Sequence, residues 1–504
     1  MRGRALMITG TSSSAGKSTL VCALGRILSD NGVQVAPFKG QNMALNSMVT
    51  RSGHEIARAQ YSQALACRVE AEVEMNPVLL KPTSEHSSQV IVMGNPRFES
   101  SGVSFQGRKK ELRTVVEGAL EQLLSRYEFV LLEGAGSPAE INLLDNDLVN
   151  LGLARRFNIP SVLIGDIERG GVFASIFGTI GILPTELSEL IVGFVVNKFR
   201  GQIEILEPGL RELEERSGVQ CFGVLPYTKV QIPEEDSLSA QGLHRSSRGT
   251  TVNPLLVSVV KLPFLSNLSD FDPLELDDGV RLSLTDSADD LLQSDLVVLP
   301  GTKSTVVDLE WLRDVGLDEA ITLAISSGKV VLGICGGYQM LGKSISDGVE
   351  SDRQFSLGLG HLNVRTTFHC EKVLRQVRGF VSNGILQGVA IDGYQIHKGV
   401  VDNLGESALF DVTSREGSAA AISTSEGALS QDQIFGTSIH GLFENDRFRE
   451  RFLLHVAQRS SKSYVSQGRN YREILDMAYD DVAKVAKEAL RVDEMLELPK
   501  YRYP

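Results

Sequence analysis

The sequence is poor in the residues that build disulfide frameworks and metal sites. Its 504 residues include five cysteines and eight histidines. The cysteines are Cys22, Cys67, Cys221, Cys335 and Cys370. Such an odd, scattered set without a C-x-x-C pair argues against a disulfide framework and against a zinc ribbon. The histidines form no H-x-x-H or H-x-x-x-H cluster, so we expect no structural metal site.

Long apolar runs and basic tracts are missing as well. No run approaches the ~20 apolar residues that a membrane-spanning helix needs. The first residues, MRGRALMITGTSSSAG, turn to serine and glycine too early for a signal peptide. A formal net charge of −13 with no basic tract disfavours a nucleic-acid partner. We therefore expect a cytoplasmic protein that acts on small molecules, with neither a nucleic-acid nor a membrane partner.

The sequence does contain two stretches in which short apolar runs alternate with helical patterns. The runs are continuous, which is typical of parallel strands covered on both faces. They comprise residues 5–9, 129–134, 161–166 and 190–198 in the first stretch, and 254–262, 294–301, 328–337 and 434–441 in the second. We therefore predict an α/β fold with two doubly wound domains.

A polar, Ser- and Gly-rich segment separates the two stretches and is typical of a linker. We expect an N-terminal domain over 1–228, the linker over 229–253 and a second domain over 254–460. The remaining residues, 461–504, carry apolar side chains at helical spacing. They predict a C-terminal helical tail packed on the second domain.

The first predicted strand runs into GTSSSAGKST, residues 10–19, which is similar to a phosphate-binding P-loop. Gly16, Lys17 and Ser18 fit the pattern G-x-x-x-x-G-K-[ST], whereas Gly10 lies one position too early. Backbone amides at a helix N-terminus would wrap a triphosphate, Lys17 would reach its β- and γ-phosphates, and Ser18 would bind Mg²⁺. A serine-rich turn that caps a helix is the alternative. The predicted ATP-binding residues of this loop are Ser13, Ser14, Ala15, Gly16, Lys17, Ser18 and Thr19.

Two further strand ends carry residues that suit the same site. Glu133 follows a buried strand and precedes a Gly-Ala-Gly turn, so we predict that it is the second Mg²⁺ ligand, with a helix-capping glutamate as the alternative. Asn197 and Lys198 stand at the end of another strand, where open α/β sheets bind ligands. They would either contact the adenine of ATP or close the turn.

The stretch VVLGICGGYQMLG, residues 330–342, places Cys335 between a strand and a helix. Small neighbours relieve the crowding of such a sharp turn, and the helix N-terminus favours a thiolate. His440, at the end of a later strand, would act as the base. A buried structural cysteine is the alternative. The predicted oxyanion hole consists of the backbone amides of Gly301, Thr302 and Gly336.

The spacing reveals no third group that would orient His440. Leu442 stands two positions after the histidine, and Glu444 stands four positions after it. Either Glu444 assists the histidine, or Cys335 and His440 act as a pair.

Several segments together resemble one family of enzymes. GTSSSAGKST, EGAGSPAEINL and DIERGGVFASIFGT are similar to the ATP-binding half shared by dethiobiotin synthetase and the cobyrinic acid amidases. GICGGYQMLG and SIHGLFEND are similar to a flavodoxin-like class I glutamine amidotransferase domain. They resemble the subgroup that lacks the usual glutamate after the histidine, and Leu442 stands at that position here. PFKGQNMALNS, EIARAQYSQALAC and MNPVLLKP resemble the cobyric acid synthase branch. The resemblance covers nearly the whole chain.

This resemblance implies an ATP-dependent carbon–nitrogen ligase of cobalamin biosynthesis that uses glutamine as amido donor. Cys335 and His440 would release ammonia from glutamine. The P-loop half would phosphorylate a carboxylate of adenosylcobyrinic acid a,c-diamide, and ammonia would then replace the phosphate. The b, d, e and g side chains would be amidated in turn, with one ATP and one glutamine each. ATP and Mg²⁺ are implied, and no bound organic cofactor.

A polyanionic substrate needs local cations in a chain of negative charge. Lys39 and Arg169, in family-like segments of the first half, are the candidates that we favour, although either could be a solvated surface charge. Three alternatives to the main interpretation stay open. They are the sister enzyme that amidates the a and c carboxylates, a P-loop ATPase whose amidase-like domain only binds, and a stand-alone glutaminase with a regulatory nucleotide domain.

Overall fold

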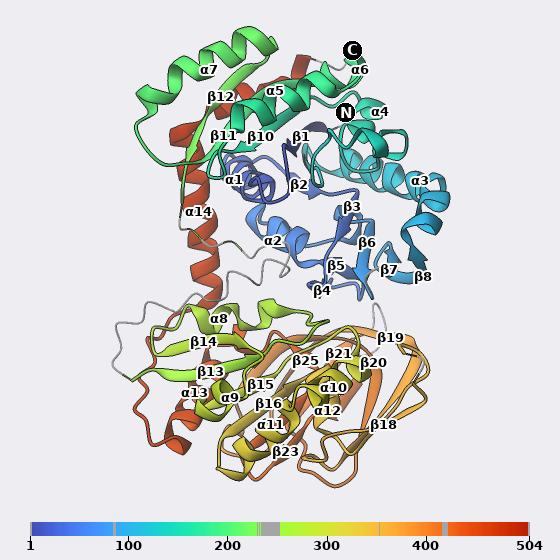
Figure 1. The fold of residues 1–504 in the computed structure, drawn as a ribbon, viewed down its shortest axis with the longest axis vertical. Helices are drawn as coiled ribbons and strands as arrows, with labels where there is room; N and C mark the ends of the chain where they lie inside the picture. The colour runs from blue at the N-terminus through green and yellow to red at the C-terminus, as the bar shows by residue number, and fades with distance from the viewer. Residues whose placement is uncertain are drawn as a thin grey trace. The chain divides into compact units, whose positions relative to one another are not determined.

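The computed structural model describes residues 3–83, 87–228, 230, 232, 253–351, 353–415 and 422–501 (Figure 1). The chain forms two compact units. Unit 1 comprises Met1–Ala44, Ile56–Glu235 and Leu475–Pro504, and unit 2 comprises Leu45–Glu55 and Asp236–Ile474. Most of the expected linker, 229–253, lies outside the described residues. No helix among the described residues is long and apolar enough to cross a membrane.

The centre of unit 1 is a six-stranded parallel sheet of order β12-β11-β10-β1-β9-β2. Its strands are β1 (Arg4–Gly10), β2 (Val35–Phe38), β9 (Phe129–Glu133), β10 (Ser161–Asp166), β11 (Ile191–Phe199) and β12 (Gln220–Pro226). They are almost wholly buried because apolar residues run along both faces. All four strands that the sequence predicts in this half are present.

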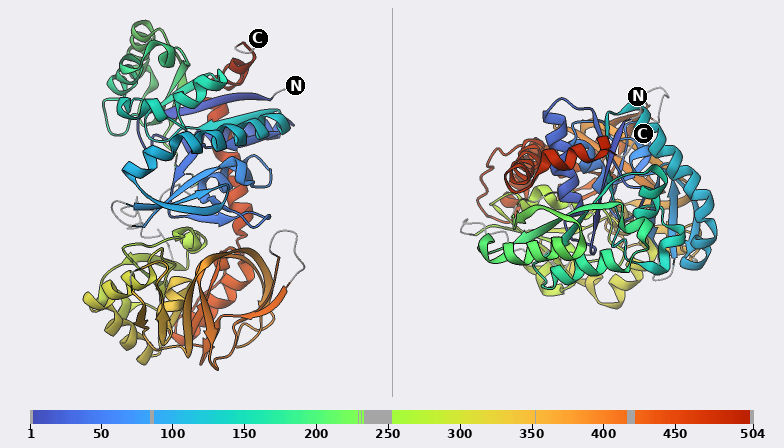
Figure 2. Two further views of the ribbon diagram at one scale, coloured as in Figure 1. Left: turned by 90° about the vertical axis from the view of Figure 1, so that its right-hand side faces the viewer. Right: turned by 90° about the horizontal axis from the view of Figure 1, so that it is seen from above.

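Helices cover both faces of this sheet. The helices of the first 228 residues are α1 (Lys17–Asp30), α2 (Arg58–Ala66), η1 (Val73–Met75), α3 (Gly102–Arg126), η2 (Ile141–Asn146), α4 (Leu151–Phe157), α5 (Val172–Ile182), α6 (Thr185–Ser188) and α7 (Ile203–Ser217). Figures 1 and 2 show α3 on one side of the sheet and α1 on the other. A smaller sheet of order β3-β6-β7-β8 also belongs to unit 1. Its strands are β3 (Gln41–Met43), β6 (Val78–Pro82), β7 (Ser87–Val92) and β8 (Asn95–Ser101).

The C-terminal tail differs from the expectation that it packs on the second domain. It contains α14 (Tyr471–Ala489), α15 (Val492–Glu497) and η6 (Leu498–Tyr501). From Leu475 onward the tail belongs to unit 1. Val482 and Ala486 join the apolar core of unit 1 beside α1, and Asp476 accepts a hydrogen bond from the buried Arg26. Amphipathic spacing shows that one face of a helix is buried, but not against which surface.

Unit 2 is built around a six-stranded sheet of order β14-β13-β15-β16-β24-β23, in which only β23 is antiparallel. Its strands are β13 (Leu255–Val260), β14 (Val280–Thr285), β15 (Leu296–Leu299), β16 (Val330–Ile334), β23 (Ala428–Ser430) and β24 (Ile434–Thr437). Its helices are η4 (Leu268–Phe271), α8 (Asp272–Glu275), α9 (Ala288–Gln293), α10 (Thr305–Asp314), α11 (Leu317–Ser326), α12 (Gly336–Leu341), η5 (Leu442–Glu444) and α13 (Asp446–Arg459). The predicted α/β fold with two domains is confirmed, and each unit is built around a wholly or mainly parallel sheet.

A second sheet of unit 2 is dominated by the long antiparallel pair β19 and β20, drawn in orange in Figure 2. Its strands are β17 (Ser344–Ser346), β18 (Phe355–Leu357), β19 (Val364–Val381), β20 (Ala390–Asn403), β21 (Phe410–Arg415), β22 (Ile422–Glu426) and β25 (Ile439–His440). The short strands β4 (Ser47–Val49) and β5 (Glu55–Ala57) pair with each other. The carboxyl ends of the two parallel sheets carry the residues described next, as is usual for α/β folds.

Candidate active sites

The loop between β1 and α1 has the backbone of a phosphate-binding turn. Ser14 and Gly16 have φ values of 59° and 105°, in the left-handed region. A Cβ atom on Gly16 would lie 2.0 Å from Nδ2 of Asn197, so no other residue fits there. The glycine of the GKST motif is therefore required by the packing of the loop against the end of β11.

Asn197 and Lys198 hold this loop from the end of β11. Asn197 Nδ2 donates to the Ala15 carbonyl at 2.9 Å. Lys198 Nζ donates to the Ser14 carbonyl at 2.9 Å and to Asp166 Oδ2 at 2.8 Å. Of the two alternatives left open by the sequence, these contacts correspond to closing the turn.

Lys17 is buried at the start of α1, and its ammonium group is held by backbone oxygens. Its Nζ donates to the carbonyls of Ser12 at 2.9 Å and Gly136 at 3.1 Å. Burial lowers the pKa of Lys17 to about 8; the charge of Glu133 opposes this shift and that of Lys39 adds to it. Lys17 is thus a cation in a setting that a nearby anion would stabilise.

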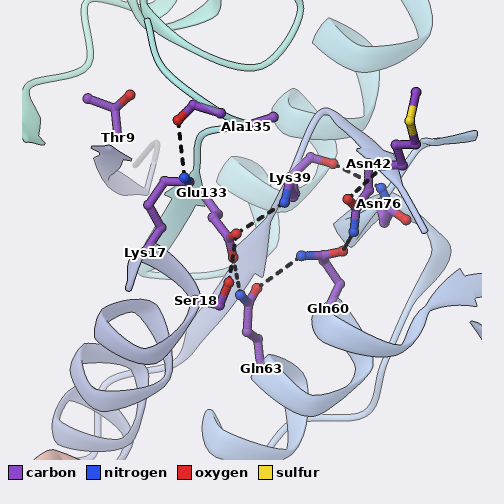
Figure 3. A network of polar contacts seen from close by, with 12 residues as sticks. Thr9, Lys17, Ser18, Lys39, Asn42, Gln60, Gln63, Asn76, Glu133 and Ala135 are labelled. Carbon is purple, nitrogen blue, oxygen red and sulfur yellow. Dashed lines mark hydrogen bonds and ion pairs between the residues drawn. The ribbon is translucent and has the colours of Figure 1, made fainter. Parts of the chain in front are cut away.

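Glu133 is the centre of a buried polar network at the end of β9 (Figure 3). Its Oε1 accepts from Ser18 Oγ at 2.9 Å and from Lys39 Nζ at 3.1 Å, and its Oε2 accepts from Gln63. Burial would raise the pKa of Glu133, but the charges of Lys39 and Lys17 and the hydrogen bonds from Gln63 and Lys39 outweigh it and lower the pKa. The carboxylate is therefore held in its ionised form.

Three further amides extend the network away from Glu133 (Figure 3). Gln60 Nε2 donates to Gln63 Oε1 at 3.5 Å, and Asn42 Nδ2 donates to Gln60 Oε1 at 2.8 Å. Asn76 Nδ2 donates to the Lys39 carbonyl at 3.2 Å. These residues lie in the segments that resemble cobyric acid synthases, but the sequence analysis did not assign them to the site. Their separation along the chain gives no signal that they converge.

The donor set around Glu133 suits a magnesium ion. Ser18 and Glu133 bring hydroxyl and carboxylate oxygens to one point, and oxygen is the ligand atom that Mg²⁺ prefers. No group of three or more His, Cys, Asp or Glu residues that could hold a metal occurs in the described part of the chain. A site with so few protein ligands fits Mg²⁺ shared with phosphate oxygens and water.

The two candidate substrate contacts lie in contrasting surroundings. Lys39, which follows β2, is 2 % exposed and ion-paired to Glu133. Arg169 is exposed on the turn between β10 and α5. Both follow strands of the central sheet, but only Lys39 belongs to the network around Glu133.

In unit 2, Cys335 occupies a strained turn between β16 and α12. Its φ and ψ are 51° and −106°, a conformation that non-glycine residues adopt at a cost. A Cβ on the next residue, Gly336, would lie 2.5 Å from Thr302 Cγ2. The thiol is nearly buried and faces the Ile396 carbonyl, 3.9 Å from Sγ. The predicted strand–cysteine–helix turn is therefore present.

His440 joins Cys335 to a buried carboxylate. Its Nδ1 lies 2.7 Å from Asp270 Oδ2, while Asp270 Oδ1 accepts from the Gly441 amide at 2.9 Å. The Tyr394 ring stacks on the imidazole with 5.3 Å between centroids. Burial would lower the pKa of His440, but the charge and hydrogen bond of Asp270 and a hydrogen bond with Cys335 raise it. The three side chains form a connected Cys–His–Asp chain.

Asp270 is not among the residues that the sequence predicts for this site. The spacing after His440 points to Glu444, whereas the carboxylate at Nδ1 comes from η4, 170 residues upstream. Asp270 lies in the loop that follows β13, a strand next to β15 in the sheet. The sequence offers one indication of Asp270, which is its position after a predicted strand. No recognisable motif surrounds this residue.

The residues predicted for the oxyanion hole are brought to the same place. A Cβ on Gly301 would lie 3.0 Å from His440 Cε1, and one on Gly336 would lie 3.2 Å from the Thr302 amide nitrogen. Thr302 Oγ1 donates to the Phe264 carbonyl at 3.0 Å and also to Asp308. These bonds fix the loop after β15 beside the start of α12.

Comparison with known proteins agrees with the two-unit architecture. Residues 6–238 match the CobQ/CobB/MinD/ParA nucleotide binding domain, and residues 256–448 match the CobB/CobQ-like glutamine amidotransferase domain. A cobyric acid synthase of Caldanaerobacter subterraneus subsp. tengcongensis is 40 % identical over 99 % of both chains. One of Streptomyces avermitilis is 43 % identical over 98 % of this chain and 96 % of its own. The chain belongs to the cobyric acid synthase family.

Proposed function

We propose that the chain makes adenosylcobyric acid by glutamine- and ATP-dependent amidation. The acceptor is adenosylcobyrinic acid a,c-diamide, whose b, d, e and g carboxylates are converted to amides with one ATP and one glutamine each. Full-length similarity to cobyric acid synthases supports the proposal. The observation that carries it is the presence, in one chain, of a Cys335–His440–Asp270 arrangement and of a P-loop next to Glu133.

In unit 2 the chemistry is the hydrolysis of glutamine. His440, whose raised pKa favours its protonated form, takes the proton of the Cys335 thiol as the sulfur attacks. The thiolate attacks the amide carbon, and the amides of Thr302 and Gly336 stabilise the oxyanion. His440 then gives its proton to the leaving nitrogen, which departs as ammonia and leaves a thioester. Water, deprotonated by His440, hydrolyses the thioester to glutamate and restores the thiol.

In unit 1 the chemistry is the activation of a carboxylate. An oxygen of the substrate carboxylate attacks the γ-phosphorus of ATP, and the bond between that phosphorus and the β-phosphate oxygen breaks. ADP departs, and the substrate is left as an acyl phosphate. Ammonia then adds to the acyl carbon, and inorganic phosphate and a proton leave. Lys17 and the amides of residues 13–18 would hold the phosphates, while Lys198 and Asn197 keep the loop closed.

Ser18 and Glu133 would hold Mg²⁺, whose charge offsets that of the phosphates when it is bound. Lys39 stands beside Glu133 and would meet the acceptor carboxylate or the γ-phosphate. Arg169, exposed after β10, would meet a further carboxylate of the acceptor. Both assignments extend the proposal and rest on position and charge.

The test is to incubate the protein with ATP, Mg²⁺, glutamine and adenosylcobyrinic acid a,c-diamide and to follow the mass of the corrinoid. Four successive amidations are expected. No change of mass would overturn the proposal. Cobyrinic acid without amides serves as the control acceptor, because its conversion to an a,c-diamide would instead identify the sister activity.

A further inference from the structure

A short segment from the first half of the sequence packs in unit 2. Leu45–Glu55 lies inside the range matched by the nucleotide-binding family, 6–238, but belongs to unit 2. At one end it is fixed by a buried ion pair, in which Lys372 Nζ lies 2.6 Å from Glu55 Oε2. Between its ends, the Val49 carbonyl accepts from Gln376 Nε2 at 3.0 Å. We call Leu45–Glu55 the strap.

The other end of the strap is bound to the loop that leads into η4. Asn46 Oδ1 accepts from the Leu268 amide at 3.0 Å. In return, Asn267 Oδ1 accepts from the Ser47 amide at 3.1 Å. Both asparagines are almost fully buried, and Asn267 has a φ of 55°. Buried, reciprocal bonds of this kind specify one position of a loop, because each unmade bond leaves a desolvated group.

This loop carries the carboxylate that contacts His440. Asp270 follows Leu268 by two residues within η4, a single turn of 3₁₀-helix. One of its carboxylate oxygens is hydrogen-bonded to His440 Nδ1, and the other accepts from the Gly441 amide. A shift of η4 therefore moves Asp270 relative to the imidazole, and a displacement of about 1 Å far from the reacting atoms can cost up to ~10²-fold in rate.

We propose that Asn46 is a positioning residue of the glutamine-hydrolysing site. By holding the Leu268 amide it sets η4 so that Asp270 meets His440. The inference rests on the proposed role of Cys335 and His440 in glutamine hydrolysis, and it assigns to the first half of the sequence a part in that site.

The test compares Asn46→Leu with Asn46→Asp, which keeps an acceptor oxygen for the Leu268 amide. Asn46→Leu should lower kcat for glutamine hydrolysis about 10-fold and change KM less than about threefold. The alkaline limb of its pH profile should move to lower pH, because a displaced Asp270 supports the imidazolium less. Asn46→Asp should restore most of the rate. Ser52→Ala, in the exposed turn of the same strap, is the matched control.

Ammonia-dependent amidation should stay within about twofold of the parent in every variant, which would show that the variants are correctly folded. Asn46→Leu should add little to the loss caused by Asp270→Asn, since both act through the same contact. Unchanged hydrolysis and pH profile in Asn46→Leu would overturn the inference, and so would equal losses of glutamine- and ammonia-dependent activity. Hydrolysis that survives Cys335→Ala would instead overturn the proposed function.

Discussion

Lys17 in unit 1 and His440 in unit 2 are both buried basic groups, but their pKa values are shifted in opposite directions. Burial lowers the pKa of Lys17 to about 8, although Glu133 lies nearby. The pKa of His440 is raised, because Asp270 gives it both a charge and a hydrogen bond at 2.7 Å. Glu133 is instead shared with Ser18 and other donors.

The difference teaches what each site is built to do. A carboxylate that is hydrogen-bonded directly to a base, as Asp270 is to His440, outweighs burial and fixes a pair that can pass protons. A carboxylate shared among several donors leaves a buried lysine undercompensated, so that a phosphate oxygen is a better partner for Lys17 than the loop carbonyls. Unit 2 therefore fits covalent acid–base chemistry, and unit 1 fits the binding of an anion. Five substitutions, described in order of decreasing effect, test this contrast and the packing of the elements behind it.

Cys335→Ala should produce the largest effect and confine it to unit 2. Removal of the nucleophile should reduce glutamine-dependent amidation at least about 10³-fold. Amidation supported by ammonium chloride should continue, because the ATP site is intact. Glutamate release and corrinoid mass are the measurements. Loss of both activities would indicate a structural role for Cys335 instead.

Asp270→Asn should reduce glutamine hydrolysis on the order of 10³-fold, because the amide no longer stabilises the imidazolium or its orientation. Ammonia-dependent amidation should again be retained. The control is Glu444→Gln, which alters the carboxylate that the sequence suggested. A greater loss in Glu444→Gln than in Asp270→Asn would contradict the assignment of Asp270.

The same pair predicts a pH dependence of stability. A folded-state pKa of His440 of about 10, above an ordinary value of 6.5, means that the pair with Asp270 stabilises the fold fully below pH 6.5. That stability is lost as the pH rises towards 10. The thermal midpoint of unfolding should therefore fall across this window more steeply in the parent than in Asp270→Asn. Parallel curves for the two proteins would argue against the pair.

Lys17→Met should impair amidation but not glutamine hydrolysis, the reverse of Cys335→Ala, and its effect should be somewhat smaller. Without the ammonium group, amidation should fall about 10²-fold with either nitrogen source, since a single charge donor at a reacting phosphate is worth about this much. Glutamate release by unit 2 should continue. The comparison of glutamate formed with amide formed measures the effect. Equal losses of both products would show that the two chemistries do not separate as proposed.

The sites differ equally in how far the sequence predicts them. The P-loop is contiguous, so one motif predicts its residues, and the end of one strand predicts Glu133. Cys335 and His440 are predicted because each stands at a strand end with a characteristic neighbourhood. Asp270 is not, since its contact with His440 depends on how the loop after β13 folds back.

The amide network and the C-terminal tail show the same limit. Gln63 and Asn42 reach the Glu133 network through the tertiary fold, and no spacing rule relates residues on separate short elements to one carboxylate. The amphipathic pattern of α14 indicated a buried face, but the contact with unit 1 is decided by surface complementarity. Local patterns thus predicted the elements, and long-range packing decided their partners.

Gln63→Ala should have a moderate effect, confined to unit 1. Loss of its hydrogen bond should raise the pKa of Glu133 and loosen the carboxylate. We expect the Mg²⁺ concentration for half-maximal ammonia-dependent amidation to rise about 10-fold, with glutamine hydrolysis unchanged. Gln122→Ala, an exposed glutamine on α3, is the matched control. An unchanged Mg²⁺ requirement would contradict a role of Gln63 in holding Glu133 for Mg²⁺ binding.

The smallest effect should come from Tyr479→Phe in α14, which tests the assignment of the tail to unit 1. Its hydroxyl lies 2.5 Å from Ser62 Oγ, and both side chains are buried. Either Tyr479→Phe or Ser62→Ala should lower the free energy of unfolding by about 1 kcal/mol, because each leaves one hydroxyl without a partner.

The double variant should cost less than the sum of the two, since removing both hydroxyls leaves neither unsatisfied. Urea unfolding at fixed ATP, followed beside the parent, gives the three values. Strictly additive losses would mean that the hydroxyls of α14 and α2 do not interact. The tail would then be bound to unit 1 by the apolar face that contains Val482 and Ala486 and by the hydrogen bond between Asp476 and Arg26.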